Sequence, residues 1–312
     1  MKVLLHYEAG PALRAQLARL AAQGLDVAVC AQADEDGFNA ALPDVEAIWH
    51  VLKPITPAHI ARANRLRLIQ KIGVGVNTIA LDAARAAGVA VCNMPGTNTR
   101  AVAEMTLLHM LAALRRQPLL DALVRSGAWT PDAAAGESFG EISGRVVGFV
   151  GFGAAPQMLA PILEAMGARV VYWARSDKTS LYPRLHLEEL LAGADLVSIH
   201  VPLTDDTHGM IGAAQLRSMK DGAVLVNTAR GGIVDERALL DALTSGRLMA
   251  AGLDVFCEEP AAATNPLLAL DQVVVTPHTA WLTQETWARS IEIAASNTLA
   301  LKQGGRLRFQ VA

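Results

Sequence analysis

The chain is poor in cysteine, and its few cysteines are badly placed for cross-linking or metal binding. Cys30, Cys92 and Cys257 are odd in number and lie far apart. This pattern excludes a dense disulfide framework and a metal site built from closely spaced thiols. We expect three reduced, mostly buried thiols in a cytoplasmic protein.

The sequence also lacks long apolar runs and a strong excess of either charge. No run approaches the ~18 apolar residues that a membrane-spanning helix needs. The segment Met1–His6 has an apolar run too short for a signal peptide and predicts a first strand instead. A net charge of −3 argues against a general nucleic-acid binder, whose affinity would depend on clustered Lys and Arg. Neither a membrane nor a nucleic acid is therefore expected as a partner.

Apolar residues are abundant. They make up 52% of 312 residues, enough for two compact domains with separate cores. In the first ninety residues, short apolar runs alternate with helical patterns, which predicts a parallel sheet with helices on both faces. The strands are expected at Val3–Leu5, Val27–Val29, Ala47–Trp49, Leu68–Ile72 and Val89–Cys92, and the helices at Ala12–Ala22, Pro57–Ala63 and Leu81–Ala87.

A second alternating region follows a long helical pattern at Thr99–Arg115, for which Asn98 is a plausible N-cap. After a loop around residues 127–140, six strands are expected, as a full doubly wound domain requires. They are Val146–Val150, Val170–Trp173, Leu196–His200, Ala223–Asn227, Ala251–Val255 and Val273–Thr276. The last segment, Gln284–Gln303, predicts one long helix that could return to the first lobe.

The segment 144–178 has the order strand, glycine turn, helix, strand, which is typical of a dinucleotide-binding βαβ unit. Gly151 would permit the tight turn, and Gly153 would let the backbone approach a pyrophosphate. The amides that open the following helix, at Ala154 and Ala155, would face the negative charge. Pro156 replaces the third glycine of the usual pattern, but proline is tolerated in the first turn of a helix. On its own this fingerprint is weak.

Seven further motifs occur in an order known from one family. They are Gly73–Asn77, Asn93–Asn98, Ala101–Glu104, His200–Thr204, Val226–Gly232, Gly252–Phe256 with Glu258–Pro260, and Pro277–Ala280. The chain thereby resembles the D-isomer-specific 2-hydroxyacid dehydrogenases over essentially its whole length. The group includes glyoxylate/hydroxypyruvate reductases and D-lactate, D-glycerate and phosphoglycerate dehydrogenases.

The resemblance implies an α/β protein of two domains, each a doubly wound parallel sheet. A flavodoxin-like substrate domain would comprise residues 1–97 and 281–312. A Rossmann cofactor domain would be inserted at 98–280. It also implies a homodimer formed through the cofactor domain, with Thr99–Arg115 and the loop after it as the contact region.

Three side chains match the chemistry that reduction of a 2-oxo acid requires. The guanidinium fork of Arg230 can hold carboxylate and carbonyl oxygens together. His278 fits the proton donor, because imidazole titrates near neutral pH. Glu259 would orient that ring and favour its protonated form; the family pattern selects it over Glu258 because it precedes Pro260 directly. Backbone amides at Val74 and Gly75 would form a small anion site for the substrate carboxylate.

By resemblance, further residues contact the cofactor. Asp254 would hold the nicotinamide side, and Val201, Thr228, Ala229, His278 and Ala280 would line the site. NAD-preferring members carry an acid at the end of the second strand, where Ala174 stands here. Arg175, Ser176 and Lys178 follow, and their cations would attract a 2′-phosphate. We expect preference for NADP(H), with NAD(H) also possible.

The sequence thus favours an NAD(P)H-dependent reductase of a small 2-oxo acid such as glyoxylate or hydroxypyruvate. Other members, such as D-lactate or phosphoglycerate dehydrogenase, stay open, as does a non-catalytic dinucleotide-sensing scaffold on the same fold. Formate dehydrogenases are disfavoured, because they have Gln at the position of Glu259. Trp281 and Trp287 either narrow the substrate pocket or pack in a core or subunit contact.

Overall fold

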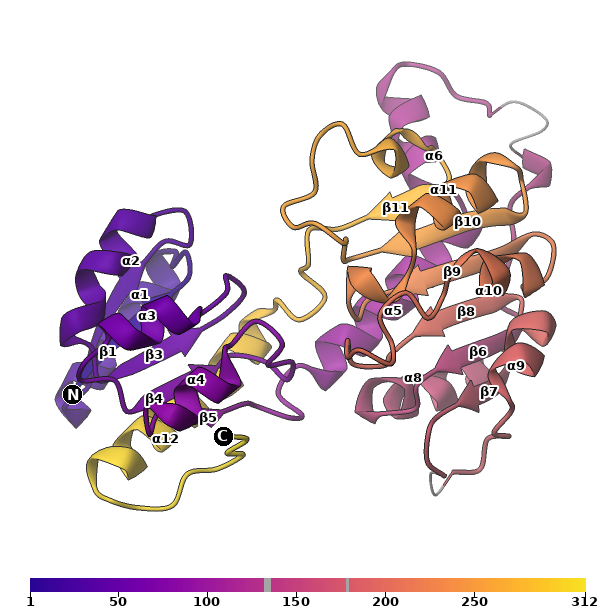
Figure 1. Cartoon of the computed structure of the whole chain (residues 1–312). Helices are drawn as coiled ribbons and strands as arrows, with labels where there is room; N and C mark the ends of the chain where they lie inside the picture. Colours follow the sequence, from indigo (N-terminus) through magenta and orange to yellow (C-terminus); the bar gives the residue numbers. More distant parts are fainter. Residues whose placement is uncertain (132–135, 178–179) are drawn as a thin grey trace. The chain divides into compact units, whose positions relative to one another are not determined.

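The computed structural model describes residues 1–131, 136–177 and 180–312. These fold as two compact units (Figure 1). The outer unit comprises Met1–Asn98 and Thr283–Ala312, and the inserted unit comprises Thr99–Leu282. Compared with the boundaries expected from sequence, Asn98 belongs to the outer unit, and Trp281 and Leu282 to the inserted one. The Leu282 amide donates to the Thr279 carbonyl at 2.9 Å, so these residues continue the turn that begins at Thr279.

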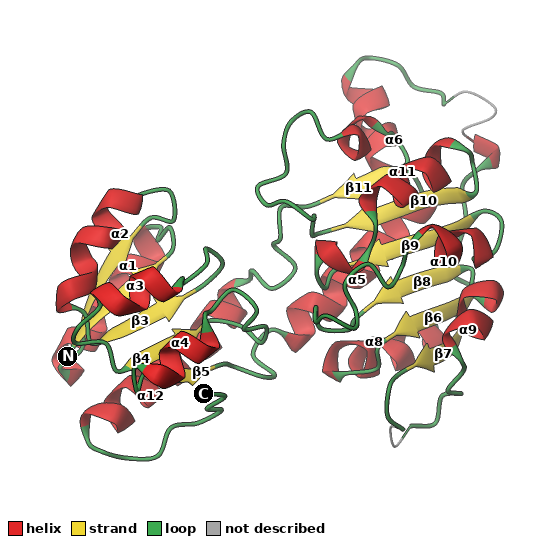
Figure 2. Cartoon of the chain, in the orientation of Figure 1, coloured by secondary structure: helices red, strands yellow, loops and turns green. Residues whose placement is uncertain are grey.

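The sheet of the outer unit has five strands in the order β2-β1-β3-β4-β5, all parallel (Figure 2). This is the flavodoxin-like order. The strands are β1 (Lys2–His6), β2 (Asp26–Cys30), β3 (Ala47–His50), β4 (Leu68–Lys71) and β5 (Ala90–Cys92), close to the expected runs. The order of the strands reverses between β1 and β3, and the predicted anion loop follows the neighbouring strand β4.

Helices cover both faces of this sheet. Those on one face are α2 (Glu35–Ala41), α3 (Pro57–Arg62) and α4 (Leu81–Ala86), which enclose a core containing Phe38, Ile60 and Ile69. Of these, α2 is absent from the expected elements. The long helix α12 (Gln284–Lys302) covers the other face, where it bonds to side chains of β3 and β4 that alternate with those of this core. Trp49 Nε1 donates to Thr298 Oγ1 at 3.0 Å, and Asn297 Nδ2 donates to Gln70 Oε1 at 2.7 Å. The last helix does return to the first lobe. The chain also forms α1 (Pro11–Ala18) between β1 and β2.

The sheet of the inserted unit has six parallel strands in the order β11-β10-β9-β8-β6-β7. They are β6 (Val146–Val150), β7 (Arg169–Trp173), β8 (Leu196–Ile199), β9 (Ala223–Asn227), β10 (Leu248–Leu253) and β11 (Val273–Val275). Beyond β7, Arg184 makes an isolated parallel bridge to Tyr172, flanked by backbone bonds from Tyr172 to Pro183 and from Leu185 to Tyr172. If residues 183–185 are counted as a strand, they form the third strand of this unit in sequence order. The strand order is then that of the Rossmann fold, 3-2-1-4-5-6, with one further strand at the end.

Two helical layers enclose this second sheet. On one face lie α5 (Thr99–Leu114) and α8 (Ala154–Ala165), which pack Met110 and Leu159 against Phe149. On the other face lie α9 (Leu187–Gly193), α10 (Ala213–Ser218) and α11 (Glu236–Thr244), whose core residues include Leu190, Leu216 and Leu239. The expected α/β architecture of two doubly wound sheets is confirmed.

Like α2, the helix α6 (Gln117–Arg125) was not expected. The sequence predicts a loop after the long helix, but α6 follows it closely. Arg116 has a left-handed backbone with φ of 47°, which ends α5 and lets the chain start a new helix in a different direction. Among the described residues, no helix combines the length and apolar character that crossing a bilayer requires.

Candidate active site

Most of the predicted site residues of the inserted unit lie where its strands end. Gly151 follows β6, Val201 follows β8, Thr228 follows β9, and Asp254 follows β10. His278 lies three residues beyond β11. Because all six strands are parallel, their carboxyl ends share one edge of the sheet, which is where open α/β sheets bind ligands.

His278 and Glu259 form a hydrogen-bonded pair at this edge. His278 Nδ1 lies 2.6 Å from Glu259 Oε2, and Glu259 Oε1 accepts the Phe256 amide at 3.0 Å. Burial opposes ionisation of Glu259, but the bond and charge of His278, the Phe256 amide and the charge of Arg230 together lower the pKa of its carboxyl. An ionised Glu259 can only accept, so His278 donates Nδ1–H and keeps Nε2 for proton exchange.

The backbone at His278 is set by Asp254. His278 has a left-handed φ of 54°, and its amide donates to the Asp254 carbonyl at 2.7 Å. The Asp254 carboxylate, 1% exposed, accepts the next two amides: Thr279 at 2.8 Å on Oδ1 and Ala280 at 2.9 Å on Oδ2. Burial raises the pKa of Asp254, while these bonds oppose that shift. Asp254 therefore fixes the loop that carries His278; a contact with the nicotinamide stays a prediction for Asp254 and for Ala280.

Arg230 lies in the loop after β9 and is largely buried. Its Nη1 donates to the Ala229 carbonyl at 2.6 Å. Burial lowers the pKa of its guanidinium, while the negative charges of Glu259 and Asp254 act in the opposite direction. Both carboxylates are thus close enough to influence Arg230 electrostatically, so the predicted anion anchor lies in the field of Glu259, the hydrogen-bond partner of His278.

The loop of Arg230 is held against the loop of Glu259. The Asn227 side chain spans it, accepting the Ala229 amide at 3.0 Å and donating to the Arg230 carbonyl at 2.9 Å. A Cβ on Gly231 would lie 1.9 Å from the Phe256 carbonyl carbon, so only glycine permits this approach of two backbones. Asn227 was not predicted to act in the site, although it stands in the quoted motif Val226–Gly232.

The glycine turn after β6 has the features expected for a dinucleotide site. Gly151 has φ of 95°, and a Cβ there would lie 2.6 Å from the His200 carbonyl oxygen. Gly153, the N-cap of α8, is exposed, and a Cβ there would meet no atom within 4 Å. Packing within the chain thus requires glycine at 151 but not at 153, where its absence of a side chain leaves room for a ligand.

The start of α8 is preserved, as the sequence predicts. The helix begins at Ala154, and Pro156 is buried in its first turn. Proline lacks an amide hydrogen, so Ala154 and Ala155 supply the N–H donors of that turn. Packing within the chain does not require a glycine at position 153. Gly153, beside the free amides of Ala154 and Ala155 at the start of the helix, fits the pyrophosphate of a dinucleotide.

The Arg184 side chain binds the residues that follow β7. Ala174 is buried, and its carbonyl accepts Arg184 Nε at 3.1 Å and Nη2 at 2.7 Å. Arg184 also forms an ion pair with Asp177, so the nearest acid after Ala174 is bound to a cation. The Arg175 side chain is 62% exposed and lies 3.8 Å from Asp206. Ser176 is exposed, and Lys178 lies outside the described residues.

The remaining predicted cofactor contacts lie on the loops after β8 and β9. Val201 is 9% exposed and packs beside Gly151. Thr228 is 8% exposed, and its Oγ1 lies 2.9 Å from Thr106 Oγ1 on α5. Thr106 donates its own hydroxyl hydrogen to the Val102 carbonyl at 2.7 Å, so Thr228 donates to Thr106. The hydroxyl of Thr228 can therefore serve a ligand only as an acceptor.

The predicted anion loop lies in the outer unit, after β4. Gly73 has φ of 134°, and Val74 is 45% exposed. The loop is bonded to the segment after β5, because the Met94 amide donates to the Gly73 carbonyl at 2.8 Å and Asn93 Nδ2 donates to the Val74 carbonyl at 2.9 Å. Gly75 is half-buried beside it. Residues of the motif Asn93–Asn98 thus hold the loop in which the amides of Val74 and Gly75 are predicted to donate to the substrate carboxylate.

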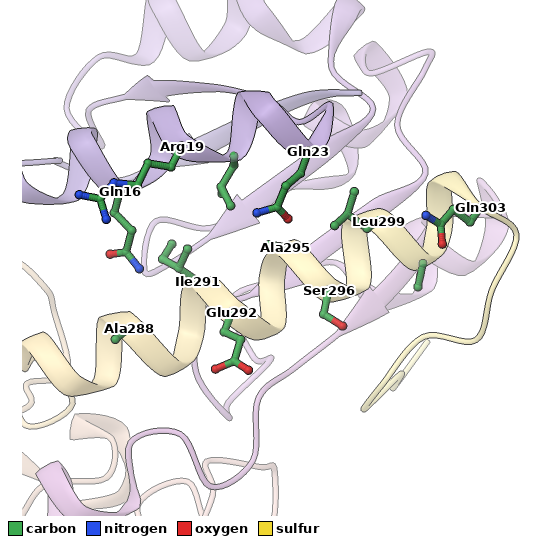
Figure 3. Close-up of a pocket in the computed structure, with 12 residues that line it drawn as sticks. Gln16, Arg19, Gln23, Ala288, Ile291, Glu292, Ala295, Ser296, Leu299 and Gln303 are labelled. Carbon is green, nitrogen blue, oxygen red and sulfur yellow. The ribbon is translucent and has the colours of Figure 1, made fainter.

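A separate groove of the outer unit runs between α12 and the segment 16–23 (Figure 3). Its volume is about 660 Å³, and Arg19, Glu292 and Ser296 are among its lining residues. None of the predicted site residues lines it.

Comparison with known proteins places the chain in a family. Residues 107–280 match the family model described as "D-isomer specific 2-hydroxyacid dehydrogenase, NAD binding domain". The glyoxylate reductase of Aeropyrum pernix is 41% identical over 257 residues, covering 78% of this chain and 76% of that protein. The chain belongs to the D-isomer specific 2-hydroxyacid dehydrogenase family.

Other relatives differ in name and length. The D-3-phosphoglycerate dehydrogenase of Mycobacterium tuberculosis is 41% identical over 276 residues, covering 86% of this chain but only 51% of that protein. The chain thus spans about half the length of the mycobacterial relatives. Among solved structures, the TT0316 protein of Thermus thermophilus is 37% identical with a TM-score of 0.91, covering 100% of both chains. A glyoxylate reductase from Paecilomyes thermophila is 28% identical with a TM-score of 0.86, covering 100% and 98%.

Proposed function

We propose that the chain is an NADP(H)-preferring reductase that converts a small 2-oxo acid of the glyoxylate or hydroxypyruvate type to the D-2-hydroxy acid. The hydrogen-bonded pair of His278 and Glu259, with Arg230 in its electrostatic field, carries the proposal. Together these side chains supply a proton donor, its orienting base and an anchor for an anionic substrate.

In the proposed reaction, the Arg230 guanidinium binds the substrate's carboxylate and polarises its carbonyl oxygen. His278 donates a proton from Nε2 to that oxygen as the carbonyl carbon is reduced. Glu259 keeps Nδ1–H bound throughout, which holds the ring in one orientation. The amides of Val74 and Gly75 are assigned to the substrate carboxylate. The nicotinamide cofactor, when bound, supplies the hydride.

For the cofactor, we assign the turn of Gly151 and Gly153 and the amides of Ala154 and Ala155 to the pyrophosphate. Val201, Thr228, Ala229, Asp254, His278 and Ala280 are assigned to the nicotinamide half. Arg175, Ser176 and Lys178 are assigned to a 2′-phosphate. The buried Ala174, at the position where NAD-preferring members carry an acid, supports NADP(H) over NAD(H).

The relatives' names favour two substrate classes. The reductase name belongs to a relative that matches most of its own length, which supports glyoxylate or hydroxypyruvate here. The mycobacterial phosphoglycerate dehydrogenases are equally similar over 276 residues, so oxidation of a phosphorylated hydroxy acid is the second candidate.

A turnover assay separates these candidates. The protein is mixed with NADPH or NADH and with glyoxylate, hydroxypyruvate, pyruvate, bulkier 2-oxo acids or 3-phosphohydroxypyruvate, and loss of reduced cofactor is followed. We expect fastest turnover of glyoxylate or hydroxypyruvate with NADPH. Preference for the phosphorylated substrate would favour the second candidate, and inactivity with all of them would favour a dinucleotide-sensing scaffold. His278→Ala and Arg230→Ala should each lower turnover by orders of magnitude.

We also propose that two copies pair through the inserted unit, with α5 and the segment after it in the interface. Light scattering after size-exclusion chromatography should give twice the mass of the 33.0 kDa chain. A mass of one chain at micromolar concentration would contradict the dimer. A cytoplasmic location stays a prediction.

A further inference from the structure

We propose that His109, on the buried face of α5, is a positioning residue for His278 and acts through Thr276 and Asp254. The proposal rests on the function proposed above and adds a residue that the sequence did not single out.

A continuous set of hydrogen bonds joins His109 to the loop of His278. His109 Nε2 lies 2.9 Å from Thr276 Oγ1, and Thr276 Oγ1 lies 2.5 Å from Asp254 Oδ1. The same carboxylate accepts the Thr279 and Ala280 amides at 2.8 and 2.9 Å. A helix on one face of the sheet is thereby connected to the two residues that follow His278.

The direction of donation along this set follows from the donor inventory. An ionised Asp254 can only accept, so Thr276 donates its single hydroxyl hydrogen to the carboxylate. Thr276 then offers only lone pairs to His109, so His109 donates from Nε2. Each bond points its hydrogen toward Asp254, and bonds to a charged acceptor are the strong ones. Losing His109 removes one donor from this set and leaves the Thr276 hydroxyl with its bond to Asp254 alone.

His109 can act only as a neutral donor at this place. It is 0% exposed, and burial lowers the pKa of its imidazole to about 4. The strand beneath it leaves room for the ring, because a Cβ on Gly252 would lie 2.8 Å from His109 Cβ and 3.0 Å from Nδ1. The glycine on β10 and the histidine on α5 therefore fit each other.

Packing alone does not account for a histidine here. Its Nδ1 is buried and has no hydrogen-bond partner among the described residues. An apolar side chain of similar size would fill the space without leaving a buried acceptor unpaired, which costs free energy. The bond to Thr276 is what a histidine provides and a leucine does not.

A second bond from the same helix supports this role for α5. Thr106, three residues before His109 and on the same helical face, bonds Thr228 at 2.9 Å. Thr228 and Thr276 each directly follow a strand, β9 and β11. One face of α5 thus holds two of the loops that carry the candidate site.

Four variants test the proposal. His109→Leu and His109→Asn remove the bond to Thr276, because leucine has no donor and asparagine is too short. His109→Gln can place its amide nitrogen near the position of Nε2. Met110→Leu, at a buried neighbour with an apolar side chain, is the matched control. The readouts are kcat and KM for reduction of the 2-oxo acid, and hydrogen–deuterium exchange of the Thr279 and Ala280 amides.

We expect His109→Leu and His109→Asn to lower kcat about tenfold, the size of a lost bond in a charged set. KM for the 2-oxo acid should change less than about twofold, because Arg230 is not affected. The Thr279 and Ala280 amides should exchange faster, and His109→Gln should restore both kcat and protection.

Wild-type kcat and exchange in both bond-deleting variants would overturn the proposal, as would a glutamine variant no better than the asparagine one. If His109→Leu does not fold, the pair of polar variants decides. If the wild-type protein reduces no 2-oxo acid, the proposed function fails. The exchange measurements then still show whether His109 holds the loop after His278.

Discussion

Glu259 binds His278 through one of its two carboxylate oxygens: Oε2 lies 2.6 Å from His278 Nδ1, while Oε1 accepts the Phe256 amide at 3.0 Å. Both carboxylate oxygens are thus occupied, and the carboxylate is fixed by the chain before it orients the ring. The imidazole has one nitrogen committed to Glu259 and one, Nε2, for proton exchange. Proton transfer is thus assigned to Nε2 and orientation of the ring to Nδ1. The contribution of Glu259 can be tested through the pH dependence of the reaction rate.

Glu259→Gln should change the pH profile of reduction. The pKa of Glu259 is lowered, so the wild-type carboxylate is ionised in the working range and accepts Nδ1–H of His278. Protonation of Glu259 removes that acceptor, so the wild-type rate should fall as pH decreases toward the lowered pKa of Glu259. Glutamine does not titrate, so the variant should lack this fall, and its kcat/KM at neutral pH should drop roughly 10- to 100-fold because the ring is no longer oriented. Steady-state rates from acid to neutral pH measure both effects.

The control for this prediction is the adjacent Glu258→Gln, which removes the same charge from an exposed side chain. Its pH profile should match that of the wild type. A fall in rate at low pH in Glu259→Gln equal to that of the wild type would mean that ionisation of Glu259 does not control the reaction.

The two glycines of the turn after β6 should respond to alanine in opposite ways. Gly151→Ala forces a Cβ into a backbone with φ of 95° and to 2.6 Å from the His200 carbonyl oxygen. It should lower stability by about 2 kcal/mol or more, seen as a fall in Tm. At Gly153, a Cβ meets no atom of the chain within 4 Å, so Gly153→Ala should leave Tm unchanged.

Gly153→Ala should instead weaken dinucleotide binding, because its methyl group fills the space above the α8 amides. We expect the Kd for NADPH, measured by calorimetry, to rise about tenfold or more, equivalent to ~1.4 kcal/mol. Unchanged affinity would place the pyrophosphate elsewhere.

Arg175→Asp should reverse the cofactor preference. The substitution puts an acid one residue beyond Ala174, where it would repel a 2′-phosphate and accept from a 2′-hydroxyl. The ratio of kcat/KM with NADPH to that with NADH should fall by about tenfold or more. Arg169→Asp makes the same charge change at the exposed opposite end of β7 and should leave the ratio unaltered. An equal ratio in both variants would exclude Arg175 from the phosphate site.

The sheets could be predicted from sequence because their strands are short, buried and apolar. β6 coincides with the expected run Val146–Val150, since a parallel strand covered on both faces contains few polar residues. The pairing of 183–185 with β7 could not be predicted, because it contains Pro183 and Arg184 and no apolar run. The helix α6 was missed because the left-handed Arg116 separates it from α5 by a sharp local turn.

The candidate site divides in a similar way. Arg230, Glu259 and His278 stand in local motifs that resemble those of the family, so they could be proposed as site residues from the sequence. His109 and Thr276 are 167 positions apart, and their bond depends on how α5 packs against the sheet. A histidine within a long helical pattern gives no local signal of such a bond. Supporting residues of this kind emerge only when the strands and helices are placed in space.

Acid should destabilise the protein partly through His109. Its imidazole is 0% exposed and burial lowers its pKa to about 4 from the ordinary 6.5, so the folded state resists a proton that the unfolded chain accepts. The corresponding stability is complete above pH 6.5 and is lost as pH falls from there toward 4. At pH 5, 1.5 units below the ordinary value, the loss should be about 2 kcal/mol, at ~1.36 kcal/mol per unit.

His109→Gln has no titrating group, so its free energy of unfolding should decrease less than that of the wild type between pH 7 and 5. Denaturant unfolding at both pH values measures the difference, and the other buried histidines cancel in the comparison. Equal acid sensitivity of the two proteins would show that His109 takes up its proton in the folded state as readily as in the unfolded chain.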